Sequence, residues 1–584
     1  MKRCFCFWLC AALLTFAAPY AMGQTILYVS QTSPNPTPPY ATWDTAAHTI
    51  QEAVDAASDG DTVLVAAGEY RPSTQGTVNL VNINKAIVLR SESGPGQTTI
   101  NATATGGGDT ATRCLWMSNS LAVVDGFTMI RGTWGGNDLA AGVVMIGGVL
   151  SNCTVKRVSA PWDSGRFVHC SGGGLITDCL IDGDIRNFTA QGGGVYLIDS
   201  ELRNSTISRM YNPLAYSGAL EGAGVYAVSS TISGCRITNN TARDVGGGAY
   251  LVGCVMDRCI IAGNKAGQSI NDEAGWGGGI FATNSVVRNS LIAGNRADPG
   301  YYPSGHALSG FGGGIYAQGG SLLNCTVARN GAGAGSMEPS KGGGIYAESV
   351  TVRNSIVYFN TAATNANWYN GGGSFDHSCT TPDPGGVGII VEDPQFVERA
   401  NGNYRLGQTS PCIDAGVNEA WMSGAQDLDG NPRIANGTVD LGGWERPPMP
   451  VVTWIAPTNG TSFPAGSDIR MSARATDPDG SVSFVEFFAN STNLGQVVSA
   501  TDVYEFVWSN APSGPFRLHA EAVDDAGGRG VSDPVLIVVG ATEPAATLGN
   551  PSPAAGDNAG GSVAISGTRA VVGAHRDAAN VWKS

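Results

Sequence analysis

Positive charge is scarce in this chain. Of its 584 residues only 33 are Lys or Arg, against 48 Asp or Glu, so the formal net charge is −15. Proteins that bind nucleic acid neutralise phosphates with clustered Lys and Arg, and the composition therefore argues against a nucleic-acid partner. Charged residues make up 14% of the chain and hydrophobic residues 42%, which is too apolar for disorder over most of its length.

Long apolar runs are also missing, except at the N-terminus. Lys2 and Arg3 precede the apolar run Cys4–Ala18, and small residues follow at 21–23. This order is typical of a signal peptide, so we expect residues 1–23 to be removed and the mature chain to be secreted or held at the cell surface. The alternative is a retained N-terminal anchor. No later segment reaches the ~18 uncharged apolar residues of a spanning helix, so no transmembrane segment is expected.

Glycine, by contrast, is abundant, at 82 residues, and it recurs in clusters. Six segments share one register, in which the first Gly of a cluster lies twelve residues before a corner residue. The clusters begin at Gly192, Gly222, Gly246, Gly277, Gly312 and Gly342, and the corner residues are Asn204, Gly234, Arg258, Asn289, Asn324 and Asn354. Within a unit the apolar residues alternate as in a β-strand. A coil of about twenty residues with short strands and Gly corners predicts an all-β fold, a right-handed parallel β-helix.

The position after each corner carries a small side chain. Along the units it is occupied by Cys153, Cys179, Ser205, Cys235, Cys259, Ser290, Cys325 and Ser355. We expect these side chains to stack in one inward column of reduced thiols and hydroxyls, because Ser replaces Cys freely; a disulfide ladder is the alternative. Cys379 and Cys412 lie outside the column and are the predicted disulfide.

The first part of the chain resembles a known superfamily. The text TILYVS, then TIQEAVDAASDGDTVLVAAGEY, then TTINA resembles the opening of secreted right-handed parallel β-helix proteins of the pectate-lyase-like superfamily. The residues agree with this resemblance. Ile50, Ala53 and Val54 form one helical stripe suited to covering the open end of a solenoid, and 62–65 and 87–89 have the pattern of first strands.

The end of the β-helix carries a second resemblance. DPQFVERANGNYRLGQTSPCIDAG, followed by DLDGNPRIANGTVDLGGWE, resembles the C-terminal cap called the choice-of-anchor Q domain, over about 379–445, which implies a bacterial surface or secreted protein. Asp427, Asp429 and Asn431 have a spacing that allows Ca²⁺ binding; a solvated turn is the alternative. No other cofactor is expected.

The rest of the chain is divided by a Pro-rich linker at 446–450. Alternating apolar residues and turns between 451 and 540 predict an immunoglobulin-like sandwich, and FPAGSDIRMSARATDPDG is similar to bacterial immunoglobulin-like domains. In 541–584, GGSVAISGTRAVVGAHRD resembles part of one FG-GAP repeat, although Asn558-Ala559-Gly560 stands where that family has Phe-Gly. A disordered tail is the alternative.

A catalytic set is not evident. β-Helix lyases need a base beside clustered carboxylates, and glycoside hydrolysis needs two opposed carboxylates. The best group of candidates is Asp178, Asp182 and Asp184 with His169 and Arg166. Ordinary exposed turns account for the same residues, because Asp and Gly dominate turns regardless of function.

The variable loops between units carry aromatic residues that are candidates for ligand binding. These are Tyr211, Tyr216, Trp276, Tyr301, Tyr302, His306, Trp368 and Tyr369. If they line one edge, sugar rings could stack on them; alternatively they fold onto one another or onto the solenoid wall. We therefore expect a non-catalytic β-helix protein that binds or adheres to polysaccharide. A polysaccharide lyase or glycoside hydrolase on the same scaffold is the alternative.

Overall fold

A computed structural model describes residues 25–72, 78–103, 112–133, 139–158, 166–183, 193–212, 221–267, 274–300, 308–478, 480–525, 528–540, 558–566 and 569–575. The chain divides into two compact units at the bond between Arg446 and Pro447. Among the described residues no helix is long and apolar enough to span a membrane.

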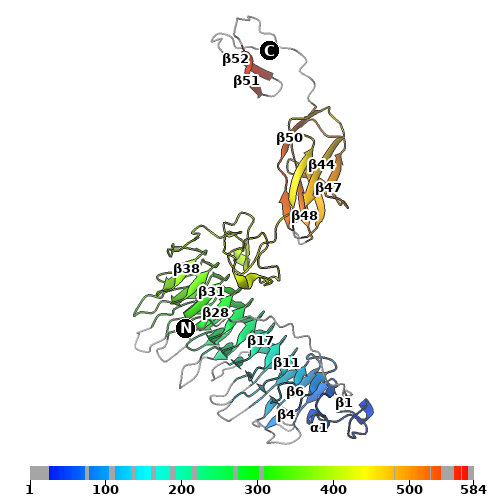
Figure 1. Cartoon of the computed structure of the whole chain (residues 1–584), viewed down its shortest axis with the longest axis vertical. Helices are drawn as coiled ribbons and strands as arrows, with labels where there is room; N and C mark the ends of the chain where they lie inside the picture. Colours follow the sequence, from blue (N-terminus) through cyan, green and yellow to red (C-terminus); the bar gives the residue numbers. More distant parts are fainter. Residues whose placement is uncertain are drawn as a thin grey trace, which may run out of the picture. The chain divides into compact units, whose positions relative to one another are not determined.

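The first unit is a right-handed parallel β-helix, as predicted (Figure 1). One coil shows the pattern: β20 (Val225–Val228), β21 (Thr231–Ser233), β22 (Arg236–Thr238) and β23 (Thr241–Ala242) follow one another at successive bends. Each strand pairs in parallel with the equivalent strand of the next coil, so that Tyr226 lies opposite Tyr250. Residues at the same place in each coil therefore form columns along the β-helix axis.

The strands of the coils form three parallel sheets within the described residues. In the described residues the first and second strands of the coils make one 22-stranded sheet. Its strands are β1 (Ile26–Val29), β2 (Thr62–Val65), β4 (Asn79–Ile83), β5 (Val88–Ser91), β7 (Arg113–Met117), β8 (Val123–Asp125), β10 (Val143–Ile146), β11 (Val149–Ser151), β13 (Val168–Ser171), β14 (Leu175–Thr177), β16 (Val195–Ile198), β17 (Glu201–Arg203), β20, β21, β24 (Ala249–Val252), β25 (Val255–Asp257), β28 (Ile280–Arg288), β31 (Ile315–Leu323), β34 (Ile345–Glu348), β35 (Thr351–Arg353), β37 (Trp368–Asn370) and β38 (Ser374–Asp376).

The second and third sheets are made by the later strands of each coil. The second sheet contains β3 (Gly68–Tyr70), β6 (Thr98–Asn101), β9 (Thr128–Ile130), β12 (Thr154–Lys156), β15 (Leu180–Asp182), β18 (Thr206–Ser208), β22, β26 (Ile260–Ala262), β29 (Leu291–Ala293), β32 (Thr326–Ala328), β36 (Ile356–Tyr358) and β39 (Cys379–Thr380). The third contains β19 (Tyr211–Asn212), β23, β27 (Lys265–Ala266), β30 (Arg296–Ala297) and β33 (Gly331–Ala332).

Glycine stacks in one corner, as its spacing predicted. Gly246, Gly277, Gly312 and Gly342 all have φ between 62° and 65°, a region that other residues adopt only with strain. The amide of Gly277 donates to Phe311 O of the next coil at 3.0 Å. A Cβ on Gly277 would lie 2.2 Å from Ile280 O, so both the backbone angle and the close approach require glycine.

Two columns of polar side chains satisfy the backbone inside the β-helix. In the first, the amide and the Nδ2 of Asn264 both donate to Asn295 Oδ1, at 2.9 and 3.0 Å, and this pattern repeats from coil to coil. Its members are the buried residues Asn240, Asn264, Asn295, Asn330, Asn360 and Asn367. Because each amide group is both donor and acceptor, the column leaves no polar group of Asn295 unpaired.

The second column is the predicted one of Cys and Ser. The amide of Cys259 donates to Ser290 Oγ at 3.0 Å, and that of Cys325 to Ser355 Oγ at 3.1 Å. Burial raises the pKa of the Cys325 thiol to about 12. The structure places the thiols inside the core, and their redox state stays a prediction.

The N-terminal helix α1 (Ile50–Ala56) packs on β1, β2 and β4. Thr49 caps it by accepting from the amide of Glu52, and the buried face consists of Ile50, Ala53 and Val54, as predicted. A short 3-10 turn, η1 (Trp43–Thr45), precedes it. Figure 1 shows α1 and β1 at one end of the stacked coils and β38 at the other.

After the last coil the chain turns back along the side of the second sheet. This return segment, 396–445, contains β40 (Phe396–Glu398), η2 (Arg399–Asn401), β41 (Asn403–Leu406) and η3 (Ala420–Met422). Tyr404 and Trp444 pack on Leu291 and Ala328 of β29 and β32. The Gly443 amide donates to Thr326 Oγ1 at 3.0 Å. The segment within the expected cap region thus covers the flank of several coils.

The second unit contains an immunoglobulin-like sandwich, as predicted. One sheet consists of β42 (Val451–Ala456), β44 (Ile469–Thr476) and β47 (Val503–Trp508). The other consists of β43 (Ser462–Phe463), β50 (Val535–Val539), β48 (Gly514–Asp524), β45 (Val482–Ala489), β46 (Thr492–Val497) and β49 (Arg529–Val531). Met471, Val485 and Phe487 belong to the core between the sheets. In the last part of the chain β51 (Asn558–Ser566) and β52 (Arg569–His575) form an antiparallel hairpin.

Candidate functional site

A ladder of stacked rings runs along the outer face of the 22-stranded sheet. In β24 the side chains of Ala249 and Leu251 face the core, and that of Tyr250 between them faces outward. The aromatic ladder consists of His169, Tyr196, Tyr226, Tyr250, Phe281, Tyr316, Tyr346 and Tyr369. Neighbouring ring centroids are 4.6 to 5.3 Å apart, and their planes lie within 23° of each other. These distances match the spacing of paired strands, about 4.8 Å.

A second column lies just before the Gly clusters, and it brings two more rings to the ladder. Isolated bridges connect Glu221, Val245, Trp276, Phe311 and Lys341 in successive coils. The Trp276 ring stacks on Tyr316 of the ladder, with centroids 5.3 Å apart and planes 12° apart.

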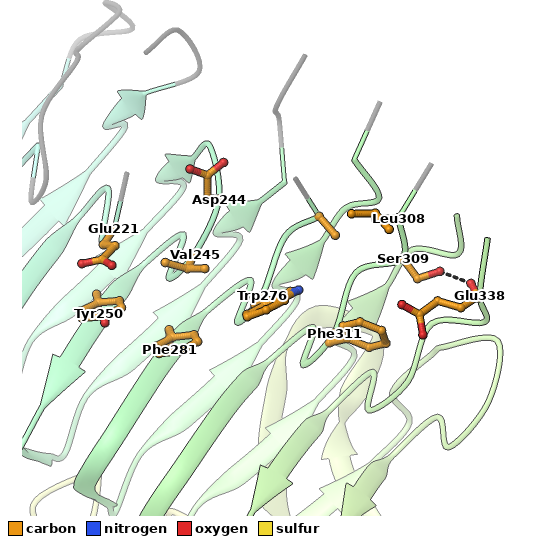
Figure 2. A pocket seen from close by; sticks show the side chains of 11 residues that line it. Glu221, Asp244, Val245, Tyr250, Trp276, Phe281, Leu308, Ser309, Phe311 and Glu338 are labelled. Carbon is orange, nitrogen blue, oxygen red and sulfur yellow. Dashed lines mark hydrogen bonds between the residues drawn. The ribbon is translucent and has the colours of Figure 1, made fainter. Parts of the chain in front are cut away.

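A groove of about 400 Å³ separates parts of these two columns; we call it the ladder groove (Figure 2). Tyr250 and Phe281 of the ladder line it together with Trp276 and Phe311 of the second column. Leu308 and Ser309 close one side. Trp276 remains 39% exposed, whereas Phe281 is only 7% exposed. The ladder groove therefore offers aromatic surface to a ligand, mainly at Trp276.

Carboxylates stand at both ends of the ladder groove. Figure 2 shows Glu221 and Asp244 at one end and Glu338 at the other. Burial raises the pKa of Glu221, and a hydrogen bond with Tyr250 opposes this rise. Asp244 is buried and pairs with Arg243, Oδ1 to Nε at 3.3 Å. None of the described residues that line the groove is Lys, Arg or His.

The aromatic residues that were predicted to lie in the loops between units occupy several different places in the structure. Trp276 lies in the ladder groove, and Tyr211 lies on β19 opposite Thr241. Trp368 and Tyr369 were expected in a loop, but this placement is wrong, because both belong to β37. Trp368 packs against Phe375 at 5.2 Å and against the core, and Tyr369 continues the ladder.

Four of the predicted ligand-binding residues lie outside the described residues: Tyr216, Tyr301, Tyr302 and His306. The ladder itself was not predicted from the sequence. Its signal is the Tyr or Phe that recurs two residues after the third position of each Gly cluster, as at Tyr316 and Tyr346. In a strand this position faces away from the buried Ile before it.

Of the catalytic candidates, the structure brings His169 and Arg166 together. His169 lies on β13 of the 22-stranded sheet, where burial and the neighbouring Arg166 lower its pKa to about 4. The Arg166 guanidinium lies 3.7 Å above the Tyr196 ring. Both residues thus belong to the end of the aromatic ladder.

The acidic candidates lie elsewhere on the coil. Asp182 is on β15 of the second sheet and pairs with Arg209. Asp178 is exposed at a corner with φ of 54°, where it accepts from the Thr177 hydroxyl at 2.7 Å. Asp184 lies outside the described residues. Asp182 and His169 therefore belong to different sheets, and Asp178 lies at a corner between strands.

The three Ca²⁺ candidates are engaged by protein groups. The Asp427 carboxylate accepts from the amides of Asp429, Asn431 and Glu445 at 2.8 to 2.9 Å. Asp429 pairs with Arg405, Oδ2 to Nε at 2.5 Å. Among the described residues, no group of three or more His, Cys, Asp or Glu is arranged to hold a metal ion.

A buried charge cluster lies in the return segment. Arg433 is fully buried, and its Nη2 contacts Glu445 Oε2 at 3.0 Å and donates to Asp440 O at 2.9 Å. Asp427 is also buried, and its carboxylate attracts the Arg433 guanidinium electrostatically. Burial raises the pKa of Glu445 to about 8 and that of Asp440 to about 6. One cation thus faces three carboxyl groups.

Cys379 and Cys412 contact one another in a small apolar cluster. Their hydrogen bond and their burial raise the pKa of the Cys379 thiol well above its usual value. Both thiols are free in this structure, and the disulfide between them stays a prediction.

Comparison with known proteins identifies one domain. Residues 450–528 match the family model of the bacterial Ig domain. No curated protein matches the chain. Fibronectin(III)-like modules of CbhA from Clostridium thermocellum are 32% identical, with a TM-score of 0.14, over 15% of this chain and 94% of theirs.

Two solved structures are similar over most of the chain. Pectate lyase Pel9A is 17% identical, covers 72% of this chain and 96% of its own, and has a TM-score of 0.40. XylC in complex with xylose is 10% identical, covers 73% of this chain and 99% of its own, and has a TM-score of 0.38. From its own strand pairing and its family match, the chain joins a parallel β-helix to a bacterial Ig domain.

Proposed function

We propose that this chain is a secreted or cell-surface, non-catalytic protein whose β-helix binds polysaccharide in the ladder groove. The observation that carries the proposal is the exposed Trp276, set beside Tyr250, Phe281 and Phe311 in a groove with carboxylates at its ends. Apolar faces of sugar rings stack on aromatic rings, and carboxylates accept hydrogen bonds from hydroxyl groups.

The location forms part of the same proposal. The N-terminal segment has the order of a signal peptide, and the resemblance of 379–445 to a choice-of-anchor domain supports attachment at a bacterial surface. The FG-GAP resemblance of the tail supports an extracellular role in adhesion.

The proposal that the protein is non-catalytic rests on where the structure places the candidate catalytic residues. Asp182 lies in a different sheet from His169 and is paired with Arg209, and Asp178 lies at an exposed corner. Hydrolysis of a glycosidic bond needs two carboxyl groups that flank it. The candidates from the sequence do not supply this arrangement within the described residues.

Affinity electrophoresis through gels that contain soluble polysaccharides tests the proposal. Trp276→Ala should weaken retention about tenfold, because a lost stacking contact costs about 1.4 kcal/mol, and it should leave Tm nearly unchanged. Trp43→Ala is the matched control, since Trp43 is 37% exposed and packs on Tyr28 of β1.

Two results would overturn the proposal. Retention that is unchanged in Trp276→Ala would show that the ladder groove is not the binding site. Release of reducing ends or of unsaturated uronates from any polysaccharide would show that the protein is an enzyme.

A further inference from the structure

The charges around the ladder groove are unbalanced. Asp244 is neutralised by Arg243, but Glu221 and Glu338 add two carboxylates to the groove lining. The pKa of Glu221 is shifted by burial and by its hydrogen bond with Tyr250, and no cation contributes to this shift. Lys341, in the second column, directs its Nζ to the Tyr369 ring at 5.2 Å. The ladder groove thus presents negative charge to its ligand.

This charge is unfavourable for polyuronates. Each ring of such a polymer carries a carboxylate, and like charges brought together without a cation repel each other, most strongly where water is partly excluded. The net charge of −15 on the whole chain adds to the repulsion at low ionic strength.

The same residues suit a cation. An ammonium group is attracted to the face of an aromatic ring and pairs with carboxylates. Trp276 and Phe311 supply the faces, and Glu221 and Glu338 supply the carboxylates on either side of them (Figure 2). Aromatic faces combined with acidic side chains are the chemistry that recognises ammonium ligands.

We infer that the ladder groove selects a polysaccharide with free amino groups, that is, a polymer of deacetylated amino sugars. The inference rests on the proposed function, because it assigns the class of sugar that the same groove binds. The sugar rings stack on Trp276, and their ammonium groups pair with Glu221 and Glu338.

Calorimetric titration of the full chain with three matched tetrasaccharides tests the inference. The probes are a β-1,4-linked glucosamine tetramer, its fully N-acetylated form and a galacturonate tetramer, at about pH 6 and low salt. The amine and the N-acetyl form differ chiefly in charge. We expect the amine form to bind at least about tenfold more tightly than the N-acetyl form and the galacturonate not to bind. High salt should remove most of the difference between the first two.

Three variants connect this preference to the groove. Glu221→Gln and Glu338→Gln should each weaken binding of the amine form about fivefold and leave the N-acetyl form within about twofold. Glu398→Gln removes an exposed carboxylate on β40, outside the groove lining, and should change neither affinity.

The outcomes separate the inference from the proposed function. Equal affinity for the amine and N-acetyl forms, or tightest binding of galacturonate, would overturn the inference and leave polysaccharide binding in place. An equal loss in Glu398→Gln would overturn it too, because the attraction would then be a property of the whole surface. If none of the three probes binds and gels with other polysaccharides show no retention, both fail.

Discussion

Replacement of Glu445 by Gln should make the β-helix more stable at alkaline pH. Glu445 lies in the buried charge cluster with Arg433, Asp440 and Asp427. Arg433 stays protonated, because guanidinium groups do not lose their proton in proteins. If all three carboxyl groups were ionised, the cluster would hold two uncompensated negative charges without water. Retaining a proton on Glu445 relieves this cost.

The sign of the pH dependence follows from the raised pKa. The pKa of Glu445 rises from 4.5 to about 8 on folding. The protonated Glu445 therefore makes its full contribution to the free energy of unfolding below pH 4.5, the pKa in the unfolded chain. This contribution decreases as the pH rises above 4.5, and the decrease ends above about pH 8, the pKa in the folded protein. At ~1.4 kcal/mol for each tenfold change in proton affinity, the loss reaches about 5 kcal/mol as an upper limit. A Gln at 445 cannot ionise in either state, so the variant lacks this slope.

Scanning calorimetry of the full chain between about pH 4.5 and 9 measures the effect. The Tm of Glu445→Gln should equal that of the unchanged protein at the acid end and exceed it increasingly towards the alkaline end. The transition of the Ig domain should not differ between the two proteins, and Glu398→Gln serves as an exposed carboxylate control. A Glu445→Gln variant that is less stable by the same amount at every pH would refute the reasoning, because Glu445 would then be ionised and stabilised by Arg433.

Three further experiments test the interpretation of the β-helix. Asn295→Ala should cost about 3 kcal/mol or more in urea unfolding, because the buried amide and Nδ2 of Asn264 lose their acceptor, Asn295 Oδ1. Gly277→Ala should prevent stable folding of these coils, whereas Gly294→Ala, with the same φ of 65° but nothing within 4 Å of its Cβ, should cost only about 1 to 2 kcal/mol. Thiol counting on the denatured, unreduced protein should find eight free thiols among the ten cysteines after residue 24, because a disulfide is predicted between Cys379 and Cys412 alone.

For each of these three predictions, one result would contradict the reasoning. Asn401→Ala, at an exposed Asn of the return segment, is the control for Asn295→Ala, and equal losses would show that the Asn column adds no stability. Similar stability of the two glycine variants would show that backbone angle, and not close approach, determines the need for glycine. Oxidation of most cysteines in the inward column would contradict the packing interpretation.

The architecture of the coils is predictable because it repeats. Gly246, Gly277 and Gly312 mark the same corner in successive units, and paired parallel strands must then stack them. The inward Cys and Ser column follows in the same way from alternation along a strand. Local pattern and register were sufficient for both.

The candidate site was only partly predictable. Trp276 was identified, but Trp368 was assigned to a loop because the Gly cluster that precedes most first strands is absent before it. The outward Tyr of each coil was overlooked because a single Tyr in a strand does not indicate a binding surface. The aromatic ladder arises only when the coils stack these rings on one another. The pairing of Arg433 with Glu445 depends on how the return segment folds over the coils, and no local periodicity records such long-range contacts.

The return segment has a mechanical consequence. A solenoid unravels from its end, since each coil touches only its neighbours. Here the chain leaves the β-helix through a segment that is bonded to several coils: Gln426 Oε1 accepts from Arg258 at 3.0 Å, Asp440 O from Asn324 at 3.3 Å and Val417 O from Asn354 at 2.9 Å. Tension applied beyond Pro447 would thus be shared among these coils and would have to peel the segment from their flank before the last coil could detach.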